Sequence, residues 1–116
     1  MSLIDTSKQD RQDKKSERKR KRELSDIRFV LKSPEGRRLY WRIMEMGQVF
    51  QNPFCLDSTN GTNYNLGRQA ISRNFLNDLL EACPDILIQM QQERESEEAS
   101  ERRLEELENK QSGDLV

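Results

Sequence analysis

The sequence predicts an all-α protein: a small domain of three to four helices that carries a basic N-terminal arm and a long acidic C-terminal helical extension. Apolar residues recur at steps of three and four between residues 27 and 90, and no segment alternates like a β-strand. Charge is segregated, because Lys and Arg outnumber Asp and Glu by 11 to 6 in residues 1–32 and are outnumbered by 9 to 4 in residues 91–116. We therefore divide the chain into an arm (1–24), a helical core (25–92) and an acidic tail (93–116).

The overall composition leaves room for one small core. The chain has 116 residues, of which 33% are hydrophobic and 35% charged, and its mean hydropathy is −1.01. A core of this size is marginally stable alone, so we expect either a homo-oligomer or docking on a partner. The sequence has no signal-peptide-like segment and no apolar run near the length of a membrane span, which predicts a soluble protein of a reducing compartment.

The arm is the first candidate contact surface. Residues 5–23 are almost all Lys, Arg, Asp, Gln, Glu and Ser, which predicts a disordered or marginally helical segment that orders on binding. The five consecutive cations at 18–22 leave three uses open: a nucleic-acid backbone, an acidic protein surface, or solubility alone. No aromatic residue lies in the run, which argues against base stacking. The predicted polyanion contacts are Lys14, Lys15, Arg18, Lys19, Arg20, Lys21 and Arg22.

The core is expected to begin at Ser25, as the cap of a short helix that holds Ile27, Phe29, Val30 and Leu31. Ser33-Pro34-Glu35-Gly36 is a clear helix start, with serine as the N-cap and proline at the first helical position. The apolar face that follows predicts a helix that ends near Gly47.

Residues 48–63 are expected to form a connecting loop, because Pro53 prevents regular continuation and turn-forming residues dominate its second half. Asn63 or a neighbour then caps a helix that runs to about Ala82. The predicted buried stripe of that helix consists of Leu66, Ala70, Phe75, Leu76, Leu79, Leu80 and Cys83.

The last helix is predicted to have Pro84 at its first helical position. From residue 91 onward the apolar face stops while helix propensity stays high, because the residues are almost all Gln, Glu, Arg and Ser. The carboxylates of this tail are spread around the helix, so we expect a solvated extension or an interaction tail.

Residue types that carry chemistry are scarce. The chain has no histidine, and Cys55 and Cys83 lack the spacing of a zinc pair. The loop at residues 57–63 has neither a phosphate-loop spacing nor the ligand series of a calcium loop. We therefore predict no catalytic residue, no cofactor and no metal, which means a protein that is not an enzyme.

A protein interface is the second candidate surface. Arginine and aromatic residues gather in and after the helix that starts at residue 34, and this combination is typical of interface hot spots. The alternative for this segment is that Leu39 and Tyr40 lie in the core while Trp41 covers the first helix. The predicted interface residues are Arg37, Arg38, Trp41, Arg42, Phe50 and Phe54.

Between residues 26 and 92 the chain has a series of sequence blocks in a fixed order: Asp26-Ile27-Arg28-Phe29-Val30-Leu31, Ser33-Pro34-Glu35-Gly36-Arg37-Arg38, Leu39-Tyr40-Trp41-Arg42-Ile43-Met44, Val49-Phe50, Asn65-Leu66-Gly67-Arg68-Gln69 and Cys83-Pro84-Asp85. With these blocks, residues 26–92 resemble a small family of tailed-bacteriophage proteins. Members of that family are typically encoded among head and DNA-packaging genes and have no assigned active site. The resemblance implies a place in the virion or in the cytoplasm of the bacterial host.

Two functional hypotheses follow. The first is a non-enzymatic virion or virion-assembly protein that docks on a head component, such as a portal, scaffold or internal protein, through its helical core. The second is a small DNA-binding accessory or regulator that contacts packaged DNA through the basic arm.

Overall fold

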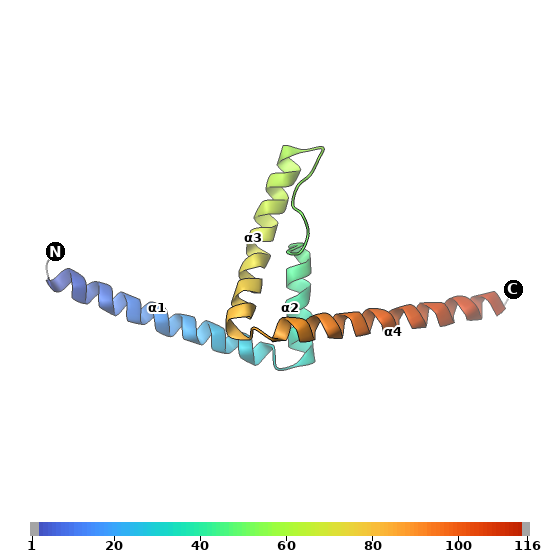
Figure 1. Ribbon diagram of the computed structural model, residues 1–116, viewed down its shortest axis with the longest axis horizontal. Helices are drawn as coiled ribbons and strands as arrows, with labels where there is room; N and C mark the ends of the chain where they lie inside the picture. The colour runs from blue at the N-terminus through green and yellow to red at the C-terminus, as the bar shows by residue number, and fades with distance from the viewer. Residues whose placement is uncertain (1–2, 115–116) are drawn as a thin grey trace.

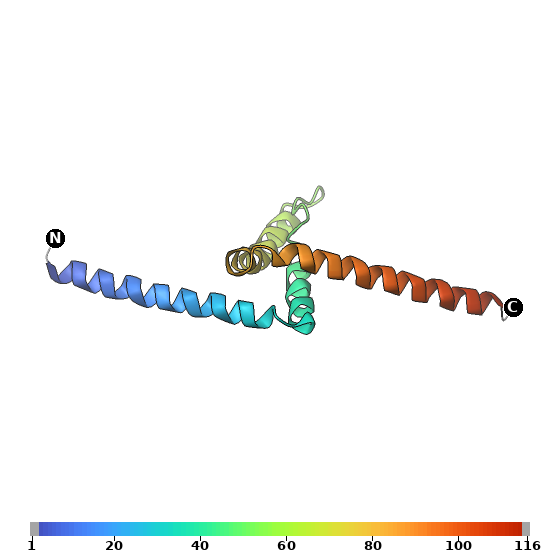
Figure 2. The same ribbon diagram turned by 60° about the horizontal axis from the view of Figure 1, so that its bottom comes forward.

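The computed structural model describes residues 3–114 and confirms the all-α prediction. Four helices follow one another, with no strand among the described residues: α1 (Leu3–Val30), α2 (Pro34–Met46), α3 (Thr59–Ala82) and α4 (Ile86–Asp114). Helices α2 and α3 form an antiparallel hairpin, and α1 and α4 leave its base in opposite directions (Figure 1). The molecule is therefore long and thin, with extents of 86 × 40 × 17 Å, as the turned view in Figure 2 also shows.

The predicted arm is part of one long helix. Helix α1 runs without interruption through Ser25, so the expectation that Ser25 caps a separate short helix is wrong. No glycine or proline occurs in residues 3–30, and the last turns of α1 pack on the domain. A helix that is nucleated at its packed end can extend through such residues, because each further residue adds a hydrogen bond.

Helix α2 has the ends that the sequence predicts. The Ser33 hydroxyl accepts a hydrogen bond from the Gly36 amide at 3.0 Å, Pro34 takes the first helical position, and Gly47 closes the helix. A side chain at Gly36 would overlap the carbonyl group of Val30, so the turn between α1 and α2 requires a glycine there.

Helices α3 and α4 start at other residues than predicted. The N-cap of α3 is Ser58, whose hydroxyl accepts from the Gly61 amide at 2.9 Å, so the loop is shorter than expected and Asn63 lies inside the helix. Serine is a strongly preferred N-cap residue. Because Ser58 caps α3, the turn-forming residues that follow it in the sequence adopt the first helical turn. Helix α4 begins at Ile86, and Pro84 lies in the turn before it instead of at the first helical position.

The core is small, and all four helices pack against it. Its buried side chains come from the α1–α2 turn, α2, the following loop, α3 and α4: Leu31, Tyr40, Met44, Val49, Leu79 and Met90. The Tyr40 ring meets the Phe75 ring edge-on at 5.6 Å between centroids, and its hydroxyl donates to the Phe75 carbonyl oxygen. Burial raises the pKa of the Tyr40 hydroxyl, so this donor stays protonated.

The buried face of α3 differs from the predicted stripe. Leu66, Ala70 and Leu80 are exposed, whereas Gln69 and Ser72 are buried. Burial of these two polar side chains is tolerated because both form hydrogen bonds with the backbone of α2 or of the loop that follows it. The Gln69 amide nitrogen donates to the carbonyl oxygens of residues 48 and 51 at 3.1 and 2.8 Å, and the Ser72 hydroxyl donates to that of residue 43 at 3.0 Å.

Candidate interaction surfaces

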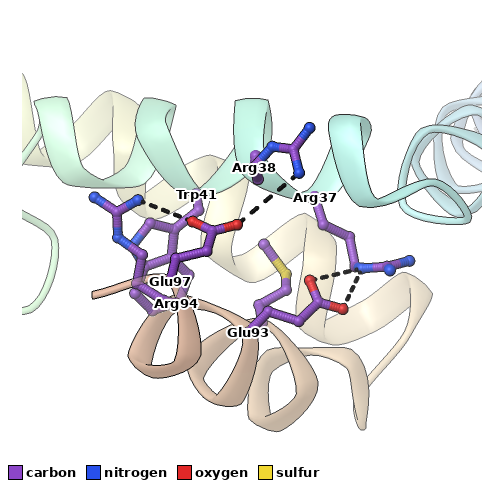
Figure 3. Close-up of a pocket in the computed structure, with 7 residues that line it drawn as sticks. Arg37, Arg38, Trp41, Glu93, Arg94 and Glu97 are labelled. Atoms are coloured by element: carbon purple, nitrogen blue, oxygen red, sulfur yellow. Dashed lines mark hydrogen bonds and ion pairs between the residues drawn. The ribbon is translucent and has the colours of Figure 1, made fainter. Parts of the chain in front are cut away.

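Arg37 joins α2 to α4 at one end of the contact in Figure 3. Its Nε lies 2.9 and 3.1 Å from the two carboxylate oxygens of Glu93, and its Nη1 donates to the carbonyl oxygens of Leu31 and Lys32. The side chain is only 10% exposed. The hydrogen bond from Arg37 lowers the pKa of Glu93 and keeps that carboxylate charged. The prediction that Arg37 faces a partner is therefore corrected, since its donors are used within the chain.

The outer part of this contact is an ionic network. The Arg94 guanidinium lies 3.4 Å from Glu45 and 3.5 Å from Glu97, and Arg38 approaches Glu97 at 3.9 Å. The Trp41 indole donates to Glu45 at 2.7 Å. The space that these residues enclose is ≈ 10 Å³, room for about one water molecule and not for a substrate. The network links α2 to α4 on the solvent side of the Arg37–Glu93 pair.

The remaining predicted interface residues lie nearer to solvent. Trp41 is half-buried and its ring packs on that of Phe50, with 5.8 Å between centroids. Arg42, Phe50 and Phe54 are exposed. The structure thus divides the predicted interface: Arg37 is internal, Arg38 and Trp41 lie in the α2–α4 contact, and the other three are open to a partner.

The far end of the hairpin carries an apolar surface, which we call the apolar tip: Phe54, Leu56 and Tyr64. Their exposed fractions are 62%, 88% and 67%. They belong to the loop and the first turns of α3, which lie at the opposite end of the hairpin from α1 and α4 (Figure 1). Leu56 and Tyr64 are absent from the predicted interface, because nothing in the local sequence separates an exposed loop leucine from a packed one.

The loop that bears the apolar tip is tied down. The Cys55 amide donates to the Thr62 hydroxyl at 2.8 Å, and the Asn65 side chain donates to the Pro53 carbonyl oxygen at 3.1 Å. Gln69 holds the start of the loop, as described above. An ordered backbone that presents aromatic side chains to solvent loses little entropy on binding, and such preorganisation favours a docking surface.

Helix α1 docks on α3 through one side. Nη2 of Arg20 lies 2.8 Å from the Asp78 carboxylate and 2.5 Å from that of Glu81, and these hydrogen bonds raise the pKa of Arg20. Ile27 packs against the core one to two turns further along. Because residues 20, 24, 27 and 31 recur at steps of three and four, they share a face, and this contact fixes the rotation of α1 about its axis.

The opposite side of α1 is a continuous cationic row, which we call the basic stripe: Lys8, Arg11, Lys15, Arg18 and Arg22. All five residues are exposed. With ~3.6 residues per turn, the stripe lies about half a turn away from the docked face, so it points away from the hairpin. Phe29 lies on the same side of α1 as the basic stripe, and its side chain is 74% exposed.

The predicted polyanion contacts divide in the same way. Arg20 is bound to α3 and is not available to a partner. Arg18, Arg22 and Lys15 belong to the basic stripe, while the remaining cations are exposed along its two edges: Lys14, Lys19 and Lys21.

Comparison of the chain with protein-family models, with curated proteins and with solved structures gave no match.

An apolar groove lies beside the docked end of α1. Its volume is ≈ 230 Å³, and it opens between the last turns of α1, α2 and α3. Apolar side chains form nearly all of its wall: Ile27, Val30, Leu39, Tyr40, Ile43 and Phe75, together with Asp26. The polar side-chain groups among its lining residues are the Asp26 carboxylate and the Tyr40 hydroxyl, and the hydroxyl already donates to the Phe75 carbonyl oxygen.

Within residues 3–114, no group of three His, Cys, Asp or Glu side chains is placed to hold a metal ion. None of the described helices combines the length and the apolar character needed to cross a membrane.

Proposed function

We propose that the chain is a non-enzymatic assembly protein that docks on a protein partner through the apolar tip of its hairpin. The observation that carries this proposal is the exposure of Phe54, Leu56 and Tyr64 on a loop whose backbone is held by internal hydrogen bonds. Aromatic side chains that are already ordered bury large areas at low entropic cost. The arrangement suits a partner with a complementary apolar pocket.

The resemblance of residues 26–92 to a tailed-bacteriophage family supplies the kind of partner. In this proposal the chain assembles with a head component, such as a portal, scaffold or internal protein, in the virion or in the host cytoplasm. The apolar tip makes the contact, and the ionic α2–α4 contact holds the rest of the chain in place.

Binding of the purified full chain to purified head proteins of the phage tests this proposal. The double variant Phe54→Ser/Leu56→Ser should lose about tenfold or more in affinity, because hot-spot truncations cost ~2 kcal/mol or more. Leu107→Ser, at another exposed leucine far along α4, serves as the control and should bind like the wild type. Equal binding by the tip variant, or no binding to any head protein, would contradict the proposal.

The basic stripe favours a second candidate function, a DNA-binding accessory. Five cations along one side of a helix, directed away from the protein, can neutralise backbone phosphates. If each cation meets one phosphate, the logarithm of the affinity falls with a slope of about −4 to −5 against the logarithm of salt concentration. A fivefold Gln variant of the stripe should lose that binding. Full-length protein that binds no duplex even at low salt would exclude this candidate.

A further inference from the structure

Helix α4 carries an acidic row where it leaves the domain. The side of α4 that faces the domain, through Met90 and Arg94, continues into solvent as four glutamates, which we call the acidic stripe: Glu98, Glu101, Glu105 and Glu108. Glu98 still reaches Arg94 at 3.7 Å, but the other three form no ion pair within residues 3–114. The side of α4 that packs on the domain near Met90 therefore continues past the domain as an exposed acidic surface.

The acidic stripe has the same spacing as the basic stripe. The glutamates follow one another at steps of three, four and three residues, and so do Lys8, Arg11, Lys15 and Arg18. Each row covers about 15 Å at ~1.5 Å per residue. A three–four–three spacing reads the same in both directions, so the two rows match in antiparallel as well as in parallel order.

The two stripes cannot meet within one molecule. Helices α1 and α4 extend in opposite directions from the base of the hairpin (Figures 1 and 2). A second copy related by a two-fold axis has its helices reversed, and such an arrangement satisfies both stripes of both copies at once. We propose that the chain forms an antiparallel homodimer in which the basic stripe of each copy lies along the acidic stripe of the other.

The exposure and charge of the two stripes predict how strong the dimer contact is and how it depends on salt. The paired residues are exposed, and exposed ion pairs are individually weak and screened by salt. Leu104 lies beside the acidic stripe and is exposed, so the aliphatic stems of lysine and arginine can cover it. The dimer should therefore be a salt-sensitive one that forms at low ionic strength. A second copy is favoured over DNA because the chain itself supplies an anionic row in matching register.

Sedimentation equilibrium of the full chain tests the pairing directly. Wild-type protein should be dimeric in about 50 mM NaCl and should dissociate at about 500 mM, where the Debye length falls to roughly 4 Å. Two charge-reversal variants break one stripe each: K8E/R11E/K15E/R18E and E98K/E101K/E105K/E108K. Each variant alone should be monomeric in low salt. An equimolar mixture of the two should recover the dimeric mass, because each then offers the charge that the other needs.

The recovery in the mixture separates pairing from misfolding, since two misfolded variants have no reason to associate one to one. Circular dichroism should show unchanged helix content in both. E95K/E106K, on the outward side of α4, is the matched control and should leave the dimer intact.

Three outcomes would overturn the proposal: a wild-type monomer in low salt, a mixture that stays monomeric, or a control that dissociates the dimer. If K8E/R11E/K15E/R18E keeps the wild-type mass but no longer binds a DNA duplex, the pairing is also wrong and the basic stripe serves DNA. The apolar tip takes no part in these tests, so the docking proposal stands or falls separately.

Discussion

The Arg37 guanidinium on α2 meets the Glu93 carboxylate on α4 at 2.9 Å, across 56 residues of sequence. The same side chain also donates to the carbonyl oxygens of Leu31 and Lys32 in the turn between α1 and α2. One arginine therefore connects α2, α4 and the α1–α2 turn around a core of six buried apolar side chains. In so small a domain this contact is expected to contribute a large share of the stability.

Replacement of Arg37 should destabilise the fold strongly. Arg37→Ala leaves two carbonyl oxygens and a carboxylate without their partner, and we expect the free energy of unfolding to fall by about 2–4 kcal/mol. Arg38→Ala removes only an exposed pair at 3.9 Å and should cost ~0.5 kcal/mol or less. Urea denaturation followed by circular dichroism compares the two. Equal losses for both variants would show that Arg37 does not connect the helices as described.

The Arg37–Glu93 pair should also make stability depend on pH. The folded pKa of Glu93 is lowered, chiefly by the hydrogen bond from Arg37, so the unfolded chain binds its proton more readily. The stabilisation is therefore complete above the ordinary carboxyl pKa and is lost as the pH falls through the lower folded value. Denaturation of the wild type and Glu93→Gln should show a gap in stability at pH 7 that narrows towards pH 3. A constant gap would exclude this linkage.

Two glycines should respond to alanine in opposite directions. A methyl group at Gly36 would overlap the backbone of Val30, so Gly36→Ala should lower the melting temperature. Gly67 lies inside α3 with nothing within 4 Å of the added carbon. Gly67→Ala should raise stability by about 0.5–1 kcal/mol, because alanine is the better helix former. If Gly36→Ala is neutral, the α1–α2 turn has a different geometry in solution.

The buried amide of Gln69 should control the order of the loop that leads to the apolar tip. Gln69→Leu removes the donor to residues 48 and 51 and leaves their carbonyl oxygens unpaired, at a cost of about 1–3 kcal/mol. Hydrogen exchange of the amides in residues 48–58 should accelerate, while that of the α1 amides stays unchanged. Gln12→Leu, at an exposed glutamine of α1, is the control. Unchanged exchange in the loop would refute the role given to Gln69.

Local signals in the sequence predicted much of the fold. The all-α class, the Ser33 cap and the Gly47 stop depend on neighbouring residues, and the structure confirms them. The predicted cap at Ser25 is wrong because a serine can lie inside a long polar helix as well as cap one. The predicted position of Pro84 inside α4 is wrong because a proline also fits the turn before a helix.

The features that decide the candidate surfaces depend on distant residues. Arg37 looked like a surface residue because its partner Glu93 lies on another helix, and Gln69 was excluded from the buried stripe because a polar side chain is buried only when a distant backbone accepts its hydrogen bonds. The helical spacing of the cations was visible in the sequence. Which side of α1 faces solvent was not, because the docking of Arg20 on α3 decides it.

We propose above that this chain is an assembly protein whose apolar tip docks on a phage head component. A mass-spectrometric inventory of purified procapsids and mature particles tests it most directly. We expect the chain in at least one of the two at a fixed copy number, and we expect its loss when Phe54→Ser/Leu56→Ser replaces the wild type. Absence of the wild-type chain from both procapsids and particles would contradict the claim.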